Sequence, residues 1–164
     1  MKKRYLVCTI LLLIIFSLFA LGSAESSVDD QGNGAVAGNA EKGNLGHYSV
    51  TIDSCRLAED WEGNPVVIVQ YTFKNVSSDD ATAFYIAVSD AVYQDGVGLN
   101  REFMVDDSAN YKSDNQEKAI KKGASIVVEV AYELNNTTSD IEVEVEEWIS
   151  LNDTVVTKTF KISD

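Results

Sequence analysis

Cysteine, proline and histidine are nearly missing from this sequence, and basic residues are scarce. Two cysteines and one histidine cannot supply the ligands of an ordinary structural zinc site, and two cysteines cannot form a disulfide-dense scaffold. Lysine and arginine number 13 against 26 acidic residues, which gives a formal net charge of −13. This charge argues against a nucleic-acid-binding protein, because such a protein needs a basic face to offset phosphate charge.

What is present is the balance of a globular protein. Apolar residues make up 45% of the 164 residues and charged residues 24%, as in a folded domain rather than a disordered chain. The length suits one domain of ordinary size. No motif fixes a reaction or a ligand, so the sequence indicates where the protein goes and how it folds better than what it does.

Residues 1–24 have the pattern of a secretory signal peptide. A basic start at residues 2–4 is followed by an almost unbroken apolar run over residues 5–21. Small residues then occupy the −3 and −1 positions of a predicted cut between Ala24 and Glu25. We therefore expect a secreted, extracellular protein that makes no membrane contact after cleavage.

The alternative is an N-terminal membrane anchor with the domain facing outside, because residues 5–21 are close to the shortest length that spans a bilayer. Cys8 does not indicate a lipoprotein, since it lies at the start of the apolar run and not after it. Cleavage would remove Cys8 and leave Cys55 alone, without an intramolecular disulfide. The core of the domain must then supply its stability.

Two regions follow the predicted signal peptide. Residues 25–46 are acidic and rich in glycine and asparagine, without apolar periodicity, and we predict a flexible, disordered linker there. From residue 47 to 164 apolar and polar residues alternate, which is typical of half-buried strands. The expected strands cover residues 48–57, 66–73, 84–93, 126–134, 141–146 and 156–162, with short extended pieces in 101–116.

About seven strands without a convincing amphipathic helix predict an all-β antiparallel sandwich over residues 47–164. The alternation slips near Cys55, which predicts a β-bulge there. Lys158 interrupts the last apolar row, and we expect its side chain to snorkel at a sheet edge.

Five stretches of the chain carry a family resemblance: His47–Ile52, Gly63–Asn75, Tyr93–Val97, Ile120–Ala124 and Val130–Leu134. Together they resemble an uncharacterised family, domain of unknown function 5067, found in secreted or surface-attached proteins of Gram-positive bacteria. The resemblance covers about residues 48–162 and implies an immunoglobulin-like fold. It rests on turn and core positions, so it implies little about function.

This chain departs from the family at two points. Lys122 stands where the family pattern usually has proline, so that turn is expected to be less rigid. Many relatives are lipid-anchored, whereas this chain lacks the cysteine that such an anchor requires. The family offers no catalytic residues to carry over.

His47 and Cys55 are the first candidates for chemistry. His47 would need a partner placed by the fold, and we expect it to be an ordinary exposed residue. Cys55 is either a reactive or dimer-forming thiol or a buried inert one, and the sequence leaves this open. A Cys–His pair is not expected, because eight residues of extended strand separate the two by about 26 Å.

Acidic and aromatic residues provide the other candidates. Asp79, Asp80, Asp106 and Asp107 lie in predicted loops that could hold calcium, although we expect solvated charge. One strand face carries Glu142, Glu144 and Glu146, and we expect a wet outer face or a guarded edge there, not a glycosidase pair.

Both tryptophans are possible platforms for sugars. We expect Trp61, which lies beside an acidic turn, to be partly exposed, and Trp148 to cap the core.

We therefore expect an exported, non-enzymatic, immunoglobulin-like module without a cofactor. It would bind an extracellular protein or a surface ligand of unknown identity through loops or an edge strand. The alternatives are a membrane-retained envelope protein with the same domain, and a secreted enzyme that uses the acidic loops with a metal. Convergent carboxylates in one concave pocket would favour the enzyme.

Overall fold

The computed structural model describes residues 35–149 and 154–162, with the backbone alone for residues 35–40. The predicted signal peptide and its predicted cut between Ala24 and Glu25 lie outside these residues. Within them, no helix is both long and apolar enough to span a bilayer.

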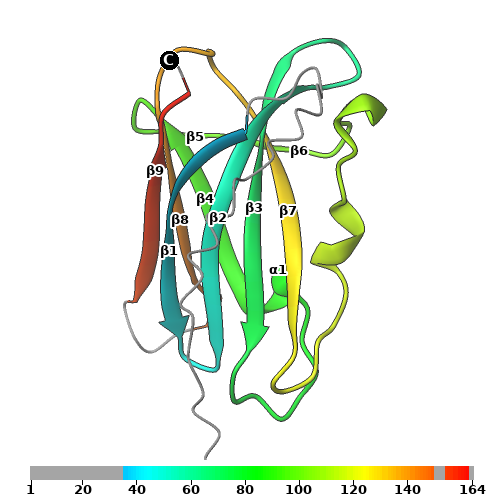
Figure 1. Cartoon of the computed structure of the whole chain (residues 1–164), viewed down its shortest axis with the longest axis vertical. Coiled ribbons are helices and arrows are strands. Elements are labelled where there is room, and N and C mark those ends of the chain that lie inside the picture. The colour runs from blue at the N-terminus through cyan, green and yellow to red at the C-terminus, as the bar shows by residue number, and fades with distance from the viewer. Residues whose placement is uncertain (1–34, 150–153, 163–164) are drawn as a thin grey trace, which may run out of the picture. The chain divides into compact units, whose positions relative to one another are not determined.

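Two antiparallel sheets face each other (Figure 1). The first has the order β1-β2-β3-β7-β6 and the second the order β5-β4-β8-β9. The strands of the first sheet are β1 (Ala35–Leu45), β2 (Tyr48–Glu59), β3 (Pro65–Asn75), β6 (Arg101–Glu102) and β7 (Ser125–Glu133). Those of the second are β4 (Val88–Gln94), β5 (Val97–Gly98), β8 (Ile141–Glu147) and β9 (Val155–Phe160).

The connectivity is that of an immunoglobulin domain. Strands β2, β3, β6 and β7 take the places of A, B, D and E, and β4, β8 and β9 those of C, F and G. Strand β5 lies beside β4, where variable-type domains add C′. The prediction of an all-β, immunoglobulin-like antiparallel sandwich is confirmed, and seven of the nine described strands have six residues or more.

Strand β1 corrects the predicted linker over residues 25–46. Its backbone pairs with β2 through a turn at Gly46, where φ is +58°. Leu45 is buried in the core, and Gly43 leaves room for the side chain of Val156 on the neighbouring β9. The segment lacks alternation, and it is a strand because its backbone pairs with β2 across this turn and packs beside β9, which is distant in the chain. Residues 25–34 lie outside the described part.

A single helical turn corrects the strand predicted over residues 84–93. Residues Phe84–Ala87 form α1, and β4 begins only at Val88. The turn directs Phe84 and Ala87 into the core and leaves Tyr85 and Ile86 exposed. Apolar residues at positions 84, 86 and 88 fit a strand, whereas those at positions 84 and 87 fit one helical turn. The sequence pattern alone therefore does not distinguish the two.

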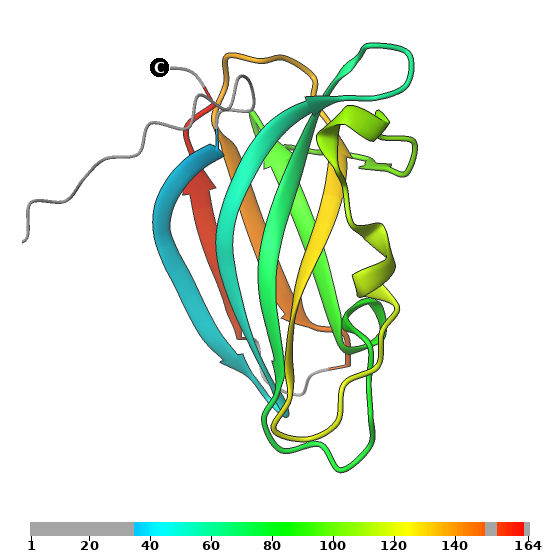
Figure 2. The ribbon, with the colours of Figure 1, turned by 45° about the vertical axis from the view of Figure 1, so that its right-hand side comes forward.

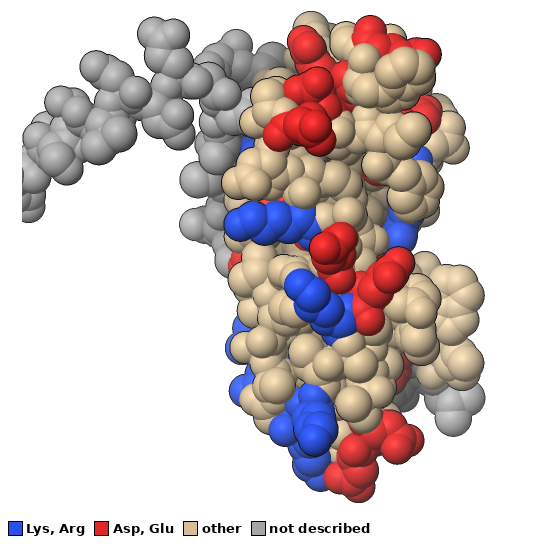
Figure 3. Space-filling model, turned by 90° about the vertical axis from the view of Figure 1, so that its right-hand side faces the viewer, with Lys and Arg blue, Asp and Glu red and all other residues tan. Residues whose placement is uncertain are grey.

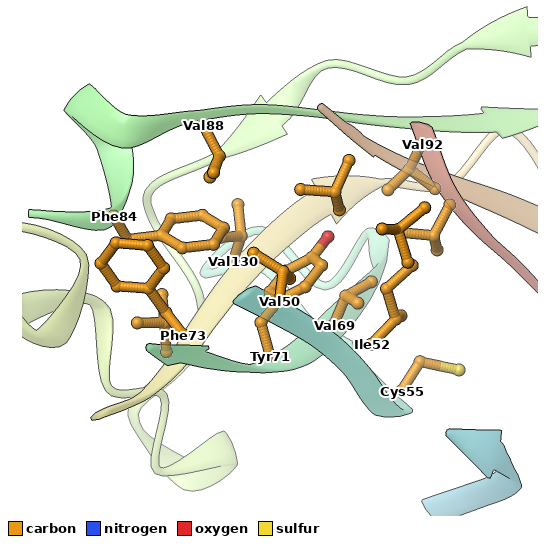
Figure 4. Close-up of a cluster of buried hydrophobic side chains, with 14 of the residues drawn as sticks. Val50, Ile52, Cys55, Val69, Tyr71, Phe73, Phe84, Val88, Val92 and Val130 are labelled. Carbon is orange, nitrogen blue, oxygen red and sulfur yellow. The ribbon is translucent and has the colours of Figure 1, made fainter. Parts of the chain in front are cut away.

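The core lies between the sheets (Figure 4). Tyr71 and Phe73 on β3 meet Phe84, with ring centroids 5.3 Å and 5.7 Å from it. Full burial of one such side chain stabilises the fold by about 1.5–3 kcal/mol. Burial of the core can therefore stabilise the domain without a disulfide.

A second, smaller cluster lies on the outer face of the first sheet. Ile68 on β3 and Ala131 on β7 pack there against Ala109. Ala109 belongs to the connection between β6 and β7, which carries the short helices η1 (Asp107–Ala109) and η2 (Ser113–Gln116) (Figure 2). This contact fixes the connection on the sheet.

The predicted bulge is confirmed, because the register of β2 against β3 shifts between Ile52 and Ser54. Lys158 on the edge strand β9 points inward and is buried, so it does not snorkel to solvent. Its Nζ donates to the carbonyl oxygens of Ile52 (2.9 Å) and Asp53 (2.8 Å), next to the bulge. Burial lowers the pKa of Lys158. An inward-facing charge on an edge strand also discourages edge-to-edge aggregation.

Candidate functional site

Neither His47 nor Cys55 belongs to a reactive arrangement. His47 is exposed in the turn between β1 and β2, where its Nδ1 lies 2.9 Å from the Ser77 hydroxyl. Cys55 is 1% exposed in the core beyond the bulge, and burial raises the pKa of its thiol to about 12. Of the alternatives left open for Cys55, the structure selects the buried, inert thiol, since a reactive cysteine needs an accessible thiolate.

The four candidate calcium ligands do not come together. Asp79 and Asp80 follow β3 at one end of the sandwich, where Lys122 pairs with Asp79 at 2.9 Å. Asp106 and Asp107 lie at the opposite end, because the Asp106 amide donates to the carbonyl oxygen of Glu59 at the end of β2. Among the described residues, no three histidine, cysteine or acidic side chains are grouped to hold a metal ion.

The three glutamates of β8 form a wet outer face, as one of the two predicted roles requires. Glu142 and Glu146 are exposed and Glu144 is half-buried, while the alternating valines face the core. Strand β8 lies between β4 and β9, so these side chains do not guard a sheet edge.

Both tryptophans are exposed, which corrects one prediction. Trp61 is 66% exposed in the turn between β2 and β3, as expected for a partly exposed platform. Trp148 is 64% exposed and does not cap the core. It follows the last residue of β8, and its amide donates to the carbonyl oxygen of Ala87. Its position has the outward parity of Glu142, Glu144 and Glu146, so a longer strand would not turn the indole inward.

Three exposed apolar side chains lie on the β2–β3 turn and on the segment bonded to it. Phe103 is 76% exposed and Met104 62%, and the Trp61 amide donates to the Met104 carbonyl oxygen at 3.0 Å. We call Trp61, Phe103, Met104 and the two grooves next to them the Trp61 end. Exposed large apolar side chains that gather at one place mark an interaction site more often than scattered ones do.

Hydrogen bonds to one carboxylate shape the β2–β3 turn. Asp60 accepts from the amides of Glu62 and Asn64 and from the Asn64 side-chain amide, each at 2.8 Å. The bonds from Asn64, its side chain first, lower the pKa of Asp60. Gly63 has a φ of +85°, which the tight turn requires. The hydrogen bonds of the neighbouring residues therefore fix the position of Trp61 in the turn.

The segment that carries Phe103 and Met104 is held in the same way. The Met104 amide donates to the Glu102 carboxylate, and the Ser108 amide donates to Asp106 at 2.9 Å. Val105 forms a β-bridge with Asp60. Beyond η1, the carboxylate of Glu129 binds Arg56 at 2.7 Å and the Lys112 amide at 3.0 Å. The loop is thus attached to the turn and to the sheet.

A buried carboxylate connects the start of this segment to the core. Asp90 on β4 has no exposed side-chain surface. Arg101 on β6 forms an ion pair with it, and the Tyr132 hydroxyl on β7 donates to it. Burial raises the pKa of Asp90, against the opposing effect of the Arg101 charge. The cluster joins the two sheets where the segment begins.

Sequence reasoning missed this cluster, although one signal was present. Asp90 shares its parity in β4 with Val88 and Val92, which are both buried. A carboxylate at an inward position of a strand needs a partner, and Arg101 is the first basic residue after it. Phe103 and Met104 were missed because the 101–116 segment has no periodicity.

Two shallow grooves adjoin the exposed apolar side chains. The first, of about 590 Å³, lies between the β2–β3 turn and the end of β7, and Trp61, Met104, Glu62, Glu102 and Glu133 line it. The second, of about 460 Å³, lies under Phe103 with Asp106 and Asp107. Figure 3 shows acidic side chains at this end of the molecule, with acidic and basic ones together over the middle and the lower end. The arrangement suits a ligand that is both apolar and cationic.

The opposite end exposes a second apolar group, formed by Tyr85, Ile86, Trp148 and Ile149. We call it the Trp148 end. Its groove is smaller, about 260 Å³. Asp79 nearby pairs with Lys122, so charges of both signs lie around it.

Comparison with known proteins gives a family and two similar folds. The model of a family described as "Domain of unknown function (DUF5067)" matches residues 23–147. A predicted lipoprotein from Staphylococcus aureus superposes with a TM-score of 0.54 at 18% identity, covering 76% of this chain and 94% of its own. YcdA, a predicted lipoprotein from Bacillus subtilis, gives 0.56 at 14% identity, covering 77% of this chain and 40% of its own. No curated protein matches the sequence.

Proposed function

The chain belongs to the family of domain of unknown function 5067, and from this premise we propose that it is a non-enzymatic binding module outside the cell, with the Trp61 end as its binding surface. The ligand would be an extracellular protein or another surface component. One observation carries the proposal: three large apolar side chains stay exposed on loops that hydrogen bonds hold in place.

The cost of that exposure supports a binding role. Each exposed side chain of this size forgoes about 1.5–3 kcal/mol that burial would contribute. A loop that served only as a connection would have no need to be fixed by the carboxylates of Asp60, Glu102 and Asp106. Prepositioned loops lower the entropy lost on binding and so favour recognition.

The solved neighbours support a location at the cell surface. Both of these proteins are lipoproteins by prediction, and this supports a cell-surface location for the present chain. For this chain we propose export with cleavage between Ala24 and Glu25, and retention of residues 5–21 as an anchor is the alternative. Intact mass spectrometry decides: a species in the culture medium that begins at Glu25 supports cleavage, and full-length chain confined to membranes overturns it.

The placement of the acids argues against a metal-assisted enzyme. The four aspartates considered as calcium ligands lie at opposite ends of the sandwich, and the β8 glutamates line an outer face. The first groove does bring Glu62, Glu102 and Glu133 to one hollow. Among the described residues, however, no three such side chains are grouped to hold a metal ion, which a metal-assisted reaction would need.

Binding to the native cell envelope tests the proposal. Labelled exported chain is added to intact cells of the organism that makes it, and bound protein is measured after washing. We expect Trp61→Ser/Phe103→Ser/Met104→Ser to lose most of the binding. The matched control, Ile86→Ser/Trp148→Ser/Ile149→Ser, also removes one tryptophan and two large apolar side chains, but from the other end.

Equal retention by the triple variant and the wild type would overturn the proposal. Loss by the control alone would transfer the binding surface to the Trp148 end. Both variants must keep the unfolding midpoint of the wild type, which is expected because all six side chains are exposed.

A further inference from the structure

We propose that the partner of the Trp61 end is a basic protein segment that presents lysine or arginine next to an apolar side chain. This inference rests on the proposed function and names the class of partner. It depends on the charges around the two grooves together with the exposed apolar side chains beside them.

The grooves are lined by acids and by no bases. Besides the structural Asp60, the first groove carries Glu62, Glu102 and Glu133. The second groove carries Asp106 and Asp107. Across both linings, which belong wholly to described residues, there is no lysine, arginine or histidine. An apolar surface within such a field repels anionic partners and attracts cationic ones.

Two arginines near these grooves are already paired, and Lys112 lies between Tyr111 and Ser113, which line the second groove. Arg56 binds the Glu129 carboxylate at 2.7 Å and 3.0 Å, and Arg101 pairs with buried Asp90. The remaining ion pair within the described residues, Lys122 with Asp79, lies at the other end. The groove carboxylates therefore keep their charge without an internal ion pair.

Neutral donors fix these carboxylates without neutralising them. Glu102 accepts from the Met104 amide, Glu133 accepts from the Asn100 side-chain amide at 3.3 Å, and Asp106 accepts from the Ser108 amide. A carboxylate has about four acceptor positions, so each keeps room for a lysine or arginine.

The apolar side chains give the second half of the recognition. The exposed indole of Trp61 can receive a cation on its face, and tryptophan is the best aromatic residue for this contact. Phe103 and Met104 offer area to an apolar residue of the partner. A bare metal ion would use none of these three side chains, and an anionic lipid surface would be repelled. A basic peptide segment uses both features.

The test uses a single fluorescent reporter. The chain has two tryptophans, so Trp148→Phe leaves Trp61 as the only indole. The probe is the synthetic peptide Gly-Lys-Phe-Gly-Lys-Phe-Gly with blocked ends, titrated while Trp61 fluorescence is followed. Its counterpart with glutamate in place of lysine is the peptide control. We expect saturable binding of the lysine peptide alone, weakening as salt is raised from low to physiological ionic strength.

Two matched variants locate the charge effect. Glu62→Gln/Glu102→Gln/Glu133→Gln removes three charges from the first groove, whereas Glu142→Gln/Glu144→Gln/Glu146→Gln removes three from the outer face of β8. The net charge of the two variants is the same. We expect the groove variant to weaken peptide binding roughly tenfold, from exposed ion pairs of modest strength, and the β8 variant to stay within about twofold.

Equal weakening by both variants would show that only the overall charge attracts the peptide, and it would overturn the inference. Binding of the glutamate peptide with the same affinity would do so as well. These outcomes differ from failure of the proposed function. If the cell-binding experiment depends on Trp61, Phe103 and Met104 but the groove variant binds cells normally, the binding surface stands and its cationic partner does not.

Discussion

The two ends of the sandwich each expose one tryptophan and other large apolar side chains, but they are built differently. At the Trp61 end the apolar side chains lie on segments fixed by carboxylates and by the ion pair that Arg101 makes with Asp90. At the Trp148 end they lie on one helical turn and on the residues after β8. Acids without a base line the grooves of both ends, but they are more numerous at the Trp61 end. At the Trp148 end they are Asp80 and Glu147, and Lys122 pairs with Asp79 nearby.

This difference shows that the exposure of an apolar side chain and the fixing of its position by polar groups are separate properties. Exposed apolar residues are common on protein surfaces and by themselves say little about binding. Exposed residues whose positions are fixed by buried or hydrogen-bonded polar groups are less easily explained, because the polar groups cost desolvation and the apolar ones gain no burial. Experiments that remove the hydrogen bonds or the ion pair at one end, and leave the other end intact, test this comparison.

The largest effect is expected from Arg101→Met. The substitution leaves Asp90 buried with the Tyr132 hydroxyl but without its cation. Removing one partner of a buried ion pair destabilises a protein by about 3–5 kcal/mol, and the partial exposure of Arg101 suggests the lower part of that range. Urea unfolding followed by far-ultraviolet circular dichroism measures the loss.

Acid should relieve part of this loss. Burial already raises the pKa of Asp90, and without Arg101 it rises further. A raised carboxyl pKa is a penalty that is present while the group is ionised and disappears as the pH falls through that pKa. The gap between variant and wild type should therefore shrink on acidification. The double variant Asp90→Leu/Arg101→Met should regain stability at neutral pH, and a double variant as unstable as the single one would contradict this account.

Local patterns indicate some elements and not others. Asp95-Gly96 is a pair typical of a tight turn, and both residues have positive φ, +53° and +76°. The bulge near Cys55 was visible as a slip in alternation. Strand β1 was not predicted although it pairs with the next strand of the chain, because its sequence has no alternation and its contact with Val156 comes from the assembled fold.

The candidate site was predictable only in part for the same reason. Exposure of Trp61 in an acidic turn was expected, whereas its contact with Met104 joins segments that lie 43 residues apart. Trp148 was wrongly expected to cap the core, although it shares the outward parity of the β8 glutamates in the sequence. Asp90 could have been found from its inward parity, but its partner Arg101 could only be guessed.

A smaller, local effect is expected from Asp60→Ala. The substitution removes the acceptor of the Glu62 and Asn64 amides and should loosen the β2–β3 turn. We expect faster hydrogen exchange at these two amides and weaker cell binding, with little change in the core. Asp60→Asn keeps an acceptor oxygen and should retain most of the protection. Unchanged exchange in the alanine variant would show that the turn holds Trp61 without this carboxylate.

Salt should distinguish the carboxylates of the two ends. The pKa of Asp60 is lowered mainly by the Asn64 side-chain amide, a neutral donor, and that of Asp79 by Lys122. Both lowered pKa values favour folding above the ordinary aspartate pKa of about 3.9, and this contribution is lost as the pH falls through the folded value. In molar salt the pKa of Asp79 should return toward normal while that of Asp60 stays low, because salt screens an exposed ion pair and not a hydrogen bond. Carboxyl carbon NMR titrations report both, and parallel shifts would refute the distinction.

The smallest effect is expected on stability when apolar side chains are removed from either end. Trp61 and Trp148 have nearly equal exposed fractions, 66% and 64%, so each loses little contact on truncation. We expect Trp61→Ser and Trp148→Ser to change the free energy of unfolding by less than about 0.5 kcal/mol each, as for most surface substitutions. Urea unfolding of the two variants side by side provides the measurement. A clear loss for Trp61→Ser alone would mean that the indole stabilises the β2–β3 turn, and its exposure would then serve the fold. Equal and negligible losses would leave binding as the property in which the two ends differ.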